Sequence, residues 1–244
     1  MTAVPSTEGR KPGFVLLAFL VFAAAVFVCL GIWQVERLQW KLDLIARVDA
    51  RVHAAPTAPP TDQQWYAGQP QDFEYRHVKA HGSFDHVHET YVQAVTELGP
   101  GYWVMTPLDR ADGPTILINR GFVPSDKRDP GTRAAGQVAG EVTVTGLLRI
   151  SEPKGGFLRS NDPAAGRWYS RDVAAIAQDR KLGDTEPYFI DADDTANPGG
   201  YPVGGLTVIR FPNSHLSYAI TWFSMALLAL GAAGYCWRLR KTAR

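Results

Sequence analysis

The sequence predicts a membrane protein of the α+β class, in which two transmembrane helices flank an antiparallel β-sandwich or barrel domain with one short helix. Two observations lead to this fold class. Long runs without any charged residue lie near both ends of the 244-residue chain, and the middle contains short β-like runs bounded by turn residues. The middle has about 150 residues, which is enough to bury a single hydrophobic core.

Both apolar runs are long enough to span a bilayer. Phe14 to Trp33 contains 20 residues and Leu216 to Trp237 contains 22, and about 20 helical residues cross the hydrocarbon core. The first run exceeds the usual apolar stretch of a cleaved signal peptide, and no small-x-small cleavage motif follows it. We therefore expect membrane-spanning helices over 13–33 and 213–237.

The flanking charges predict the orientation of the chain. The tails 1–12 and 238–244 carry six basic residues and one acid, a net charge of +5, whereas Gln34 to His215 has 19 basic and 23 acidic residues, a net charge of −4. Arg37 and Lys41 argue weakly the other way, but long segments translocate largely regardless of charge. We expect both termini in the cytoplasm and the central domain outside it.

The spacing of Trp33, Arg37, Trp40 and Leu44 predicts that the first helix continues beyond the membrane to about Val52. Three prolines between positions 54 and 60 then predict a linker. This divides the exported part into a helical extension with linker, 34–59, and a β-rich domain, 60–212. In the spans, Ala229 and Ala233 offer a surface of small residues for close approach to one of the alanines at 23–25.

Turn residues delimit eight short β-like runs in the domain. The expected strands are Phe73–Ala80, Glu89–Val95, Tyr102–Leu108, Thr115–Val123, Glu141–Arg149, Arg167–Ser170, Pro187–Asp191 and Leu206–Phe211. One helix is expected over Arg171–Leu182 and an exposed loop over Asp126–Gly140. Asn119–Gly121 is expected to form a turn that places Arg120 against an acidic residue.

Several function classes find no support in the sequence. The G-x-S-x-G, P-loop and G-x-G-x-x-G patterns are absent, so we do not expect an enzyme. The negative exported segment argues against nucleic-acid binding. Both cysteines, Cys29 and Cys236, fall in the expected spans, which argues against disulfides and thiolate metal sites in the domain.

Four histidines fall in one short window of the domain, but their spacing fits no standard zinc signature. They are His77, His81, His86 and His88. We expect an exposed hairpin instead, with residues 81–85 forming its turn and His86 and His88 sharing a strand face.

A series of motifs runs through almost the whole chain in a fixed order. Gly31, Trp33, Gln34, Arg37, Trp40 and Lys41 form the pattern G-x-W-Q-x-x-R-x-x-W-K. The later motifs are Gly99–Tyr102, Thr106–Leu108, Ile118–Pro124, Gly146–Arg149, Trp168–Tyr169, Pro187–Asp191 and Asn213–Phe223. With these motifs in a two-helix frame, the chain resembles the surfeit locus protein 1 family of cytochrome c oxidase assembly factors. Phe122 departs conservatively from the tryptophan of many relatives.

The resemblance implies a role and a cofactor. Bacterial members of the family are thought to bind haem A, the cofactor of oxidase subunit I, through a histidine at the start of the second helix, which here is His215. The expected partners are subunit I, membrane lipid and, as a source of cofactor, haem A synthase. The residues before the first span are few and include Glu8, unlike a mitochondrial presequence, so we expect a bacterial plasma membrane.

The residues around His215 have two interpretations. His215, Tyr218, Trp222, Met225 and Ala229 would share one helix face, so that His215 could ligate the haem iron while Tyr218 and Trp222 flank the macrocycle. Alternatively, His215 is a polar helix cap and the two aromatic residues are interfacial packing. Met225 is a weaker candidate for a second ligand.

Arg37 also has two interpretations, and the function has three. Arg37 either anchors the first helix at the membrane interface, together with Trp33, Trp40 and Lys41, or it pairs with a haem propionate or an acid of the oxidase. The chain either carries haem A or acts as a cofactor-free chaperone that stabilises nascent subunit I. An unrelated two-span receptor with a ligand-binding β domain is a third hypothesis, which the order of the motifs disfavours.

Overall fold

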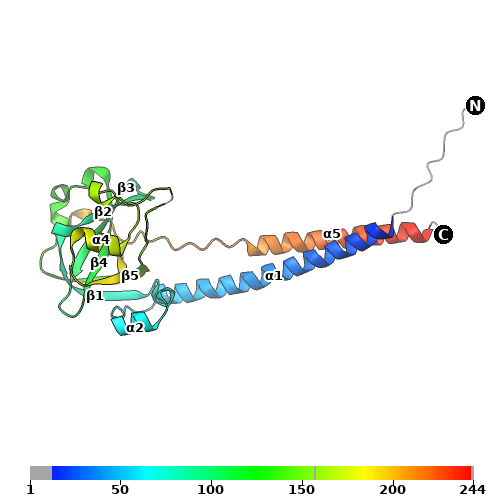
Figure 1. The fold of residues 1–244 in the computed structure, drawn as a ribbon, viewed down its shortest axis with the longest axis horizontal. Helices are drawn as coiled ribbons and strands as arrows, with labels where there is room; N and C mark the ends of the chain where they lie inside the picture. Colours follow the sequence, from blue (N-terminus) through cyan, green and yellow to red (C-terminus); the bar gives the residue numbers. More distant parts are fainter. Residues whose placement is uncertain (1–12, 157, 243–244) are drawn as a thin grey trace, which may run out of the picture. The chain divides into compact units, whose positions relative to one another are not determined.

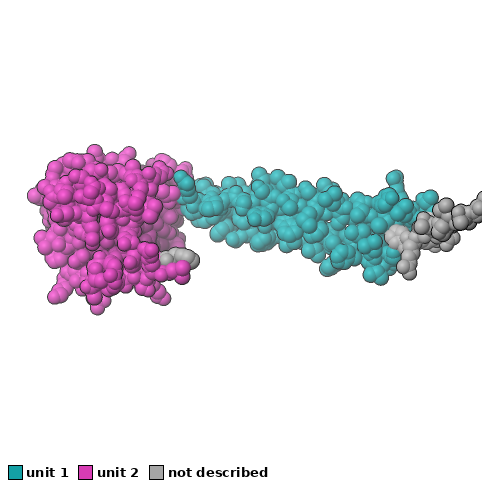
Figure 2. Space-filling view, turned by 90° about the horizontal axis from the view of Figure 1, so that it is seen from above, with its two compact units in different colours: residues 1–47, 210–244 teal, residues 48–209 magenta. Residues whose placement is uncertain are grey.

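The computed structural model describes residues 13–156 and 158–242. The predicted tail 1–12 and the last two residues of the predicted tail 238–244 lie outside the described residues. The chain divides into two compact units, one formed by the residues up to 47 together with 210–244, the other by 48–209 (Figure 2). The first unit is helical, and the second contains the β-sheet.

Two long helices form the first unit, α1 (Phe14–Val52) and α5 (His215–Thr242). Both are long enough and apolar enough, by length and composition, to cross a membrane. This confirms the two helical elements that the charge-free runs predict. Helix α1 continues to Val52, as the spacing of its aromatic and basic residues indicates.

The two helices pack against each other in opposite directions (Figure 1). Phe27 stacks on Trp222 and Lys41 lies over the ring of Phe211, so residue numbers rise along one helix as they fall along the other. Most of the covered positions are spaced alternately three and four residues apart, the period of a left-handed helix pair. We call them the seam: Leu17, Leu20, Ala24, Phe27, Gly31, Gln34, Leu38 and Lys41 on α1, and Ala219, Trp222, Ala226, Ala229, Ala233 and Cys236 on α5.

Small residues dominate the α5 side of the seam. Ala229 and Ala233 are buried there, as expected, and so is Ala24 on α1, whereas its neighbour Ala25 is exposed. Small side chains let two helices approach closely enough for van der Waals contact between their backbones, which is a main source of attraction between helices in lipid.

The second unit contains a sheet of six strands. They are β1 (His77–Phe84), β2 (Thr90–Thr96), β3 (Gly99–Asp109), β4 (Thr115–Pro124), β5 (Glu141–Ile150) and β6 (Thr185–Ala192). Their order is β1-β5-β6-β4-β3-β2, and an additional pairing of β1 with β3 closes five of them into a barrel, with β2 attached to β3.

The barrel alternative of the predicted fold is therefore correct, but the sheet is mixed rather than wholly antiparallel. Strands β4 and β6 run parallel, whereas the other pairs are antiparallel. A parallel pair needs a long crossover connection, and the chain between Pro124 and Thr185 provides it. Local patterns in the sequence do not specify this pairing.

Two predicted strands are absent, and a third begins later than predicted. Phe73 lies in a short helix, α3 (Pro70–Phe73), which follows α2 (Asp62–Ala67), so β1 starts only at His77. Residues 167–170 and 206–211 do not form strands, and Trp168 makes only an isolated bridge with Val92. The expected helix is present as α4 (Val173–Arg180), which begins after the N-cap Asp172.

Alternation along the strands creates two hydrophobic clusters. On β4, Ile116 and Ile118 face one cluster and Leu117 faces the other. The first cluster is closed by Trp65 and Phe73 from α2 and α3, while α4 packs on the second through Val173 and Ile176, together with Trp168. This explains why Phe73, an apolar residue in a β-like run, is buried without being in a strand.

Two smaller expectations about loops are corrected. Asn119–Gly121 lies within β4 and is not a turn. The stretch 126–140 is not wholly exposed, because it contains a 3₁₀ segment in which Arg133 and Gly136 are buried. Arg120 does lie against an acid, as predicted: its Nη1 is 3.4 Å from Oε1 of Glu89.

Candidate functional site

His215 is the first residue of α5 and is half-buried. Its Nδ1 lies 2.7 Å from the side-chain oxygen Oε1 of Gln34 on α1. An amide oxygen can only accept a hydrogen bond, so this contact is a hydrogen bond in the tautomer that carries the proton on Nδ1. The lone pair of the neutral ring is then on Nε2, the nitrogen through which an imidazole can ligate a metal.

Gln34 is held in place by its position in the seam. Its side chain is buried, with 8% of the residue exposed. One turn earlier, Gly31 faces the ring of Phe223, and a Cβ at position 31 would lie only 2.6 Å from the nearest ring atom. The absence of a side chain at Gly31 therefore lets the two helices approach at this level.

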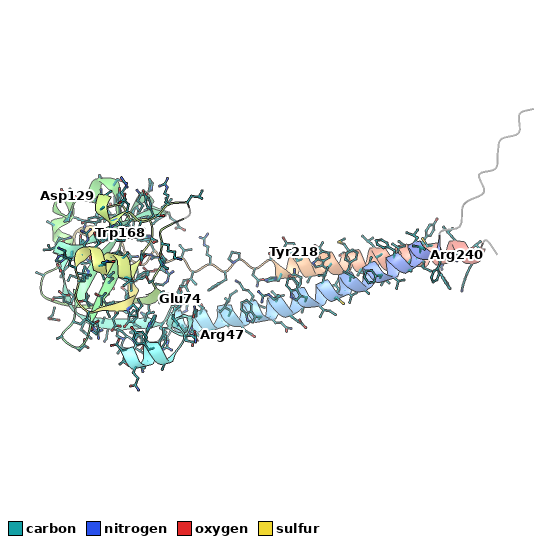
Figure 3. All side chains as sticks on the ribbon, in the orientation of Figure 1. Arg47, Glu74, Asp129, Trp168, Tyr218 and Arg240 are labelled. Atoms are coloured by element: carbon teal, nitrogen blue, oxygen red, sulfur yellow. The ribbon has the colours of Figure 1, made fainter. Side chains whose placement is uncertain are left out.

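The predicted face of α5 divides in two. His215, Trp222 and Ala229 face α1, where the ring of Trp222 stacks on Phe27 with centroids 5.8 Å apart and an interplanar angle of 25°. Tyr218 lies near the beginning of α5 (Figure 3). It is 54% exposed, and Met225 is 38% exposed. The structure therefore brings Trp222 into the seam and leaves the ring of Tyr218 at its edge.

Arg37 lies on the exposed surface of α1. Its guanidinium carbon is 4.5 Å from the centroid of the Trp40 ring, a cation–π contact within the same helix. Within residues 13–156 and 158–242, no carboxylate forms an ion pair with Arg37. The contact with Trp40 is compatible with the anchoring interpretation. Among the described residues, the charge of Arg37 has no anionic partner.

The domain histidines are used by the fold. His86 lies between Glu89 and the carbonyl of Val138, and His88 contacts Asp85. Both belong to a 3₁₀ turn rather than to a strand face, and residues 81–84 belong to β1 rather than to a turn, which corrects the expected hairpin. Among the described residues, no group of three or more histidine, cysteine or acidic side chains could hold a metal ion.

The domain contains two buried charge clusters, of which the sequence patterns indicate only that Arg120 lies against an acid. Glu89 accepts hydrogen bonds from Arg120 and Arg133, the latter at 2.6 Å. Burial alone would raise the pKa of Glu89, but the hydrogen bond and charge of Arg133 hold it below its ordinary value. The second cluster surrounds Asp191, which accepts hydrogen bonds from Asn119, Arg149, Arg171 and Thr207.

The role of Gln34 is also missed, because its partner lies 181 positions away in the sequence. One signal in the sequence could have indicated this role. Gln34 is an uncharged polar residue that continues the three- and four-residue spacing of the apolar and small residues before it. A buried amide in such a position needs a hydrogen-bond partner, and the partner is His215.

Together, the fold and the site define a protein with a β-barrel domain between two apolar helices and a hydrogen-bonded histidine at the start of the second helix. The sequence model of the SURF1 family matches residues 21–227 of the chain. The chain therefore belongs to the SURF1 family. This membership implies a role in the assembly of cytochrome c oxidase.

Individual relatives support the same assignment along almost the whole chain. The chain is 40% identical to surfeit locus protein 1 of Rattus norvegicus, over 90% of this chain and 73% of the rat protein. It is 36% identical to that of Homo sapiens, over 95% and 79% of the two chains. It is also 38% identical to a SURF1-like protein of Monosiga brevicollis, over 94% and 90%.

Proposed function

We propose that this protein binds haem A at the start of α5 and assists its insertion into subunit I of cytochrome c oxidase. The observation that carries the proposal is the hydrogen bond between Gln34 and His215, since it leaves Nε2 as the free ring nitrogen. The iron of bound haem A supplies the Lewis-acid centre to which such a nitrogen coordinates. His215 is the chain's ligand in this proposal.

The surroundings of His215 suit a large, flat, apolar group with acidic edges. Tyr218 and Trp222 place aromatic rings within the next two turns of α5, and the exposed surface beyond them is apolar. Arg37, on the turn after Gln34, is the cation that we assign to a propionate. On leaving its contact with Trp40, the guanidinium group of Arg37 would be free to bind the propionate through two N–H groups.

The proposal includes a location and an orientation. Both helices lie in a bacterial plasma membrane, both termini face the cytoplasm and the β-barrel domain lies outside. The net charge of +5 on the two tails supports this orientation through the positive-inside rule. Subunit I is then the receiving partner and haem A synthase the source, and no nucleic acid is involved.

The proposed role can be tested in bacteria that lack their own copy of the gene. Plasmids would supply the wild type, His215→Ala or His81→Ala, and the haem A content of oxidase in the membranes would be measured from reduced-minus-oxidised spectra. His81 is an exposed domain histidine bonded to Thr143, so His81→Ala is the matched control. We expect the wild type and the control to restore the oxidase haem signal and His215→Ala to fail.

Full restoration by His215→Ala would contradict the assigned ligand. The cofactor-free chaperone hypothesis makes a different prediction. If the protein purifies without haem, even from cells that make haem A, and subunit I co-purifies with both the wild type and His215→Ala, the chain stabilises subunit I without carrying its cofactor.

A further inference from the structure

Gln34 is an unusual member of the seam. Most other members are apolar or small, and Lys41 directs its ammonium group over the ring of Phe211. Gln34 instead directs a neutral amide against the facing helix, where it is buried. A buried amide without a partner costs about 1–3 kcal/mol in proteins, so the seam favours conformations in which Gln34 is bonded to His215.

The hydrogen bond constrains His215 in two ways. It selects the tautomer with the proton on Nδ1, because the partner atom is an acceptor, and it restricts rotation of the ring about the bond to Cβ. Histidines that ligate metals generally donate their second ring nitrogen to an oxygen in this way. Here the oxygen comes from the other helix.

Gly31 and Phe223 set the distance at which this bond forms. Gly31 lies one turn before Gln34 and is buried against the Phe223 ring. A Cβ at position 31 would lie 2.6 Å from the nearest atom of that ring, so either the Phe223 ring or the helices would have to shift. A shift of the helices at this level would also alter the reach of Gln34 to His215, one turn away.

We propose that Gln34 is a positioning residue for His215: through its side-chain oxygen it fixes the tautomer and orientation of the imidazole, so that Nε2 is presented as the ligand atom before any cofactor binds. The benefit for cofactor binding rests on the proposed function, whereas the constraint on the ring is a property of this chain alone. An ordered ligand loses less conformational freedom on binding, which increases affinity.

The chemistry of position 34 predicts distinct effects for different side chains. Leucine removes the acceptor but keeps similar bulk, so the tautomer is no longer fixed. Glutamate keeps an acceptor oxygen at nearly the same distance and adds negative charge, which increases the basicity of the ring. Gln34→Glu should therefore preserve ligation and lower the reduction potential of the bound iron, whereas Gln34→Leu should weaken ligation.

The first arm of the experiment observes the ring directly, without cofactor. Full-length protein labelled with nitrogen-15 at histidine would be prepared free of haem in detergent micelles. Nitrogen–proton correlation spectra would be recorded at a pH at which the rings are neutral, and His215 would be assigned by comparison with His215→Ala. We expect the wild-type signal of a ring protonated on Nδ1, and a change to Nε2 protonation or a mixture in Gln34→Leu.

The matched control is Gln39→Leu, since Gln39 is an exposed glutamine on the same helix. It should leave the His215 signal as in the wild type. A wild-type His215 protonated on Nε2 would overturn the proposal, and so would a Gln34→Leu variant that retains the wild-type signal.

The second arm titrates the same variants with haem A and measures affinity and reduction potential. We expect Gln34→Leu to bind about 10 to 100 times more weakly, as for other residues that orient a metal ligand. Gln34→Glu should restore affinity and show a lower potential than the wild type. Equal affinity and equal potential in all three would overturn the role of Gln34 in cofactor binding.

Failure of the proposed function gives a separate result. If His215→Ala binds haem A as tightly as the wild type, His215 is not the ligand, and both the proposed function and the cofactor part of this inference fail. The first arm still decides whether Gln34 fixes the His215 ring.

Discussion

At the scale of single residues, the β-barrel domain contains a carboxyl group whose charge is unfavourable in the folded state. Glu186 is buried, and burial raises its pKa to about 7, with Asp62 and Asp184 contributing in the same direction. Arg110, 3.7 Å away, acts in the opposite direction. The folded protein therefore holds this proton to a higher pH than the unfolded chain does.

Ionisation of Glu186 makes the free energy of unfolding depend on pH. Glu186 binds more protons in the folded than in the unfolded state between pH 4.5 and about 7, so the free energy of unfolding falls as the pH rises through that window. Glu186→Gln should raise the free energy of unfolding by on the order of 1–3 kcal/mol at pH 8, and by much less at pH 5. Denaturant unfolding of the full chain in micelles, monitored by tryptophan fluorescence, measures both values.

The control for this prediction is Glu141→Gln, because Glu141 is an exposed carboxylate at the start of β5. It should change little at either pH. An equal effect of Glu186→Gln at pH 5 and pH 8 would show that ionisation of Glu186 is not its cause.

Asp191 is the second residue with a large expected effect. Its carboxylate is buried and accepts hydrogen bonds from Arg149 at 2.8 Å and Arg171 at 2.9 Å. Asp191→Ala would leave two mostly buried cations with fewer partners, at an expected cost of about 3–5 kcal/mol in the free energy of unfolding. Denaturant midpoints test this against Asp72→Ala, an exposed carboxylate for which we expect a change within about 0.5 kcal/mol.

At the scale of elements, local composition determines how much the sequence can predict. The spans are predictable because a run without charge reflects composition alone, and β4 and β5 match their expected ranges because β-branched residues alternate there. The sequence assigns Phe73 to a strand in error, because a short run with a buried aromatic residue has the same pattern in a short helix as in a short strand. The parallel pairing of β4 with β6 and the bond between Gln34 and His215 arise from contacts between distant segments.

The close approach of α1 and α5 is also an element-scale property, and it can be tested at Gly31. Gly31→Leu should separate the helices at the level of Phe223 and lower the ratio of bound haem to protein several-fold. Gly231→Leu is the matched control, since a Cβ at Gly231 would meet no atom within 4 Å. The double variant Gly31→Leu/Phe223→Ala should recover part of the loss, because it removes the ring that the new side chain would meet.

Retention of wild-type haem content by Gly31→Leu alone would contradict this account of the seam. A loss that Phe223→Ala does not reduce at all would indicate that the leucine acts elsewhere, and the distance between the helices would then not be the controlling feature.

At the scale of the whole molecule, the uneven distribution of charge predicts the orientation in the membrane. The segment between the spans has a net charge of −4, against +5 on the tails. A fluorescent protein that folds only in the cytoplasm should fluoresce when fused after the last residue, and a phosphatase active only outside should be active when fused at position 60. The reverse pattern would contradict the proposed orientation.

The proposed function depends on His215 as the haem ligand of this chain. The most direct measurement is the absorption spectrum of the full-length protein purified from cells that make haem A, compared between the wild type and His215→Ala at equal protein concentration. We predict a Soret band in the wild type that is lost or strongly reduced in His215→Ala. A Soret band of the same position and intensity in both proteins would contradict this assignment.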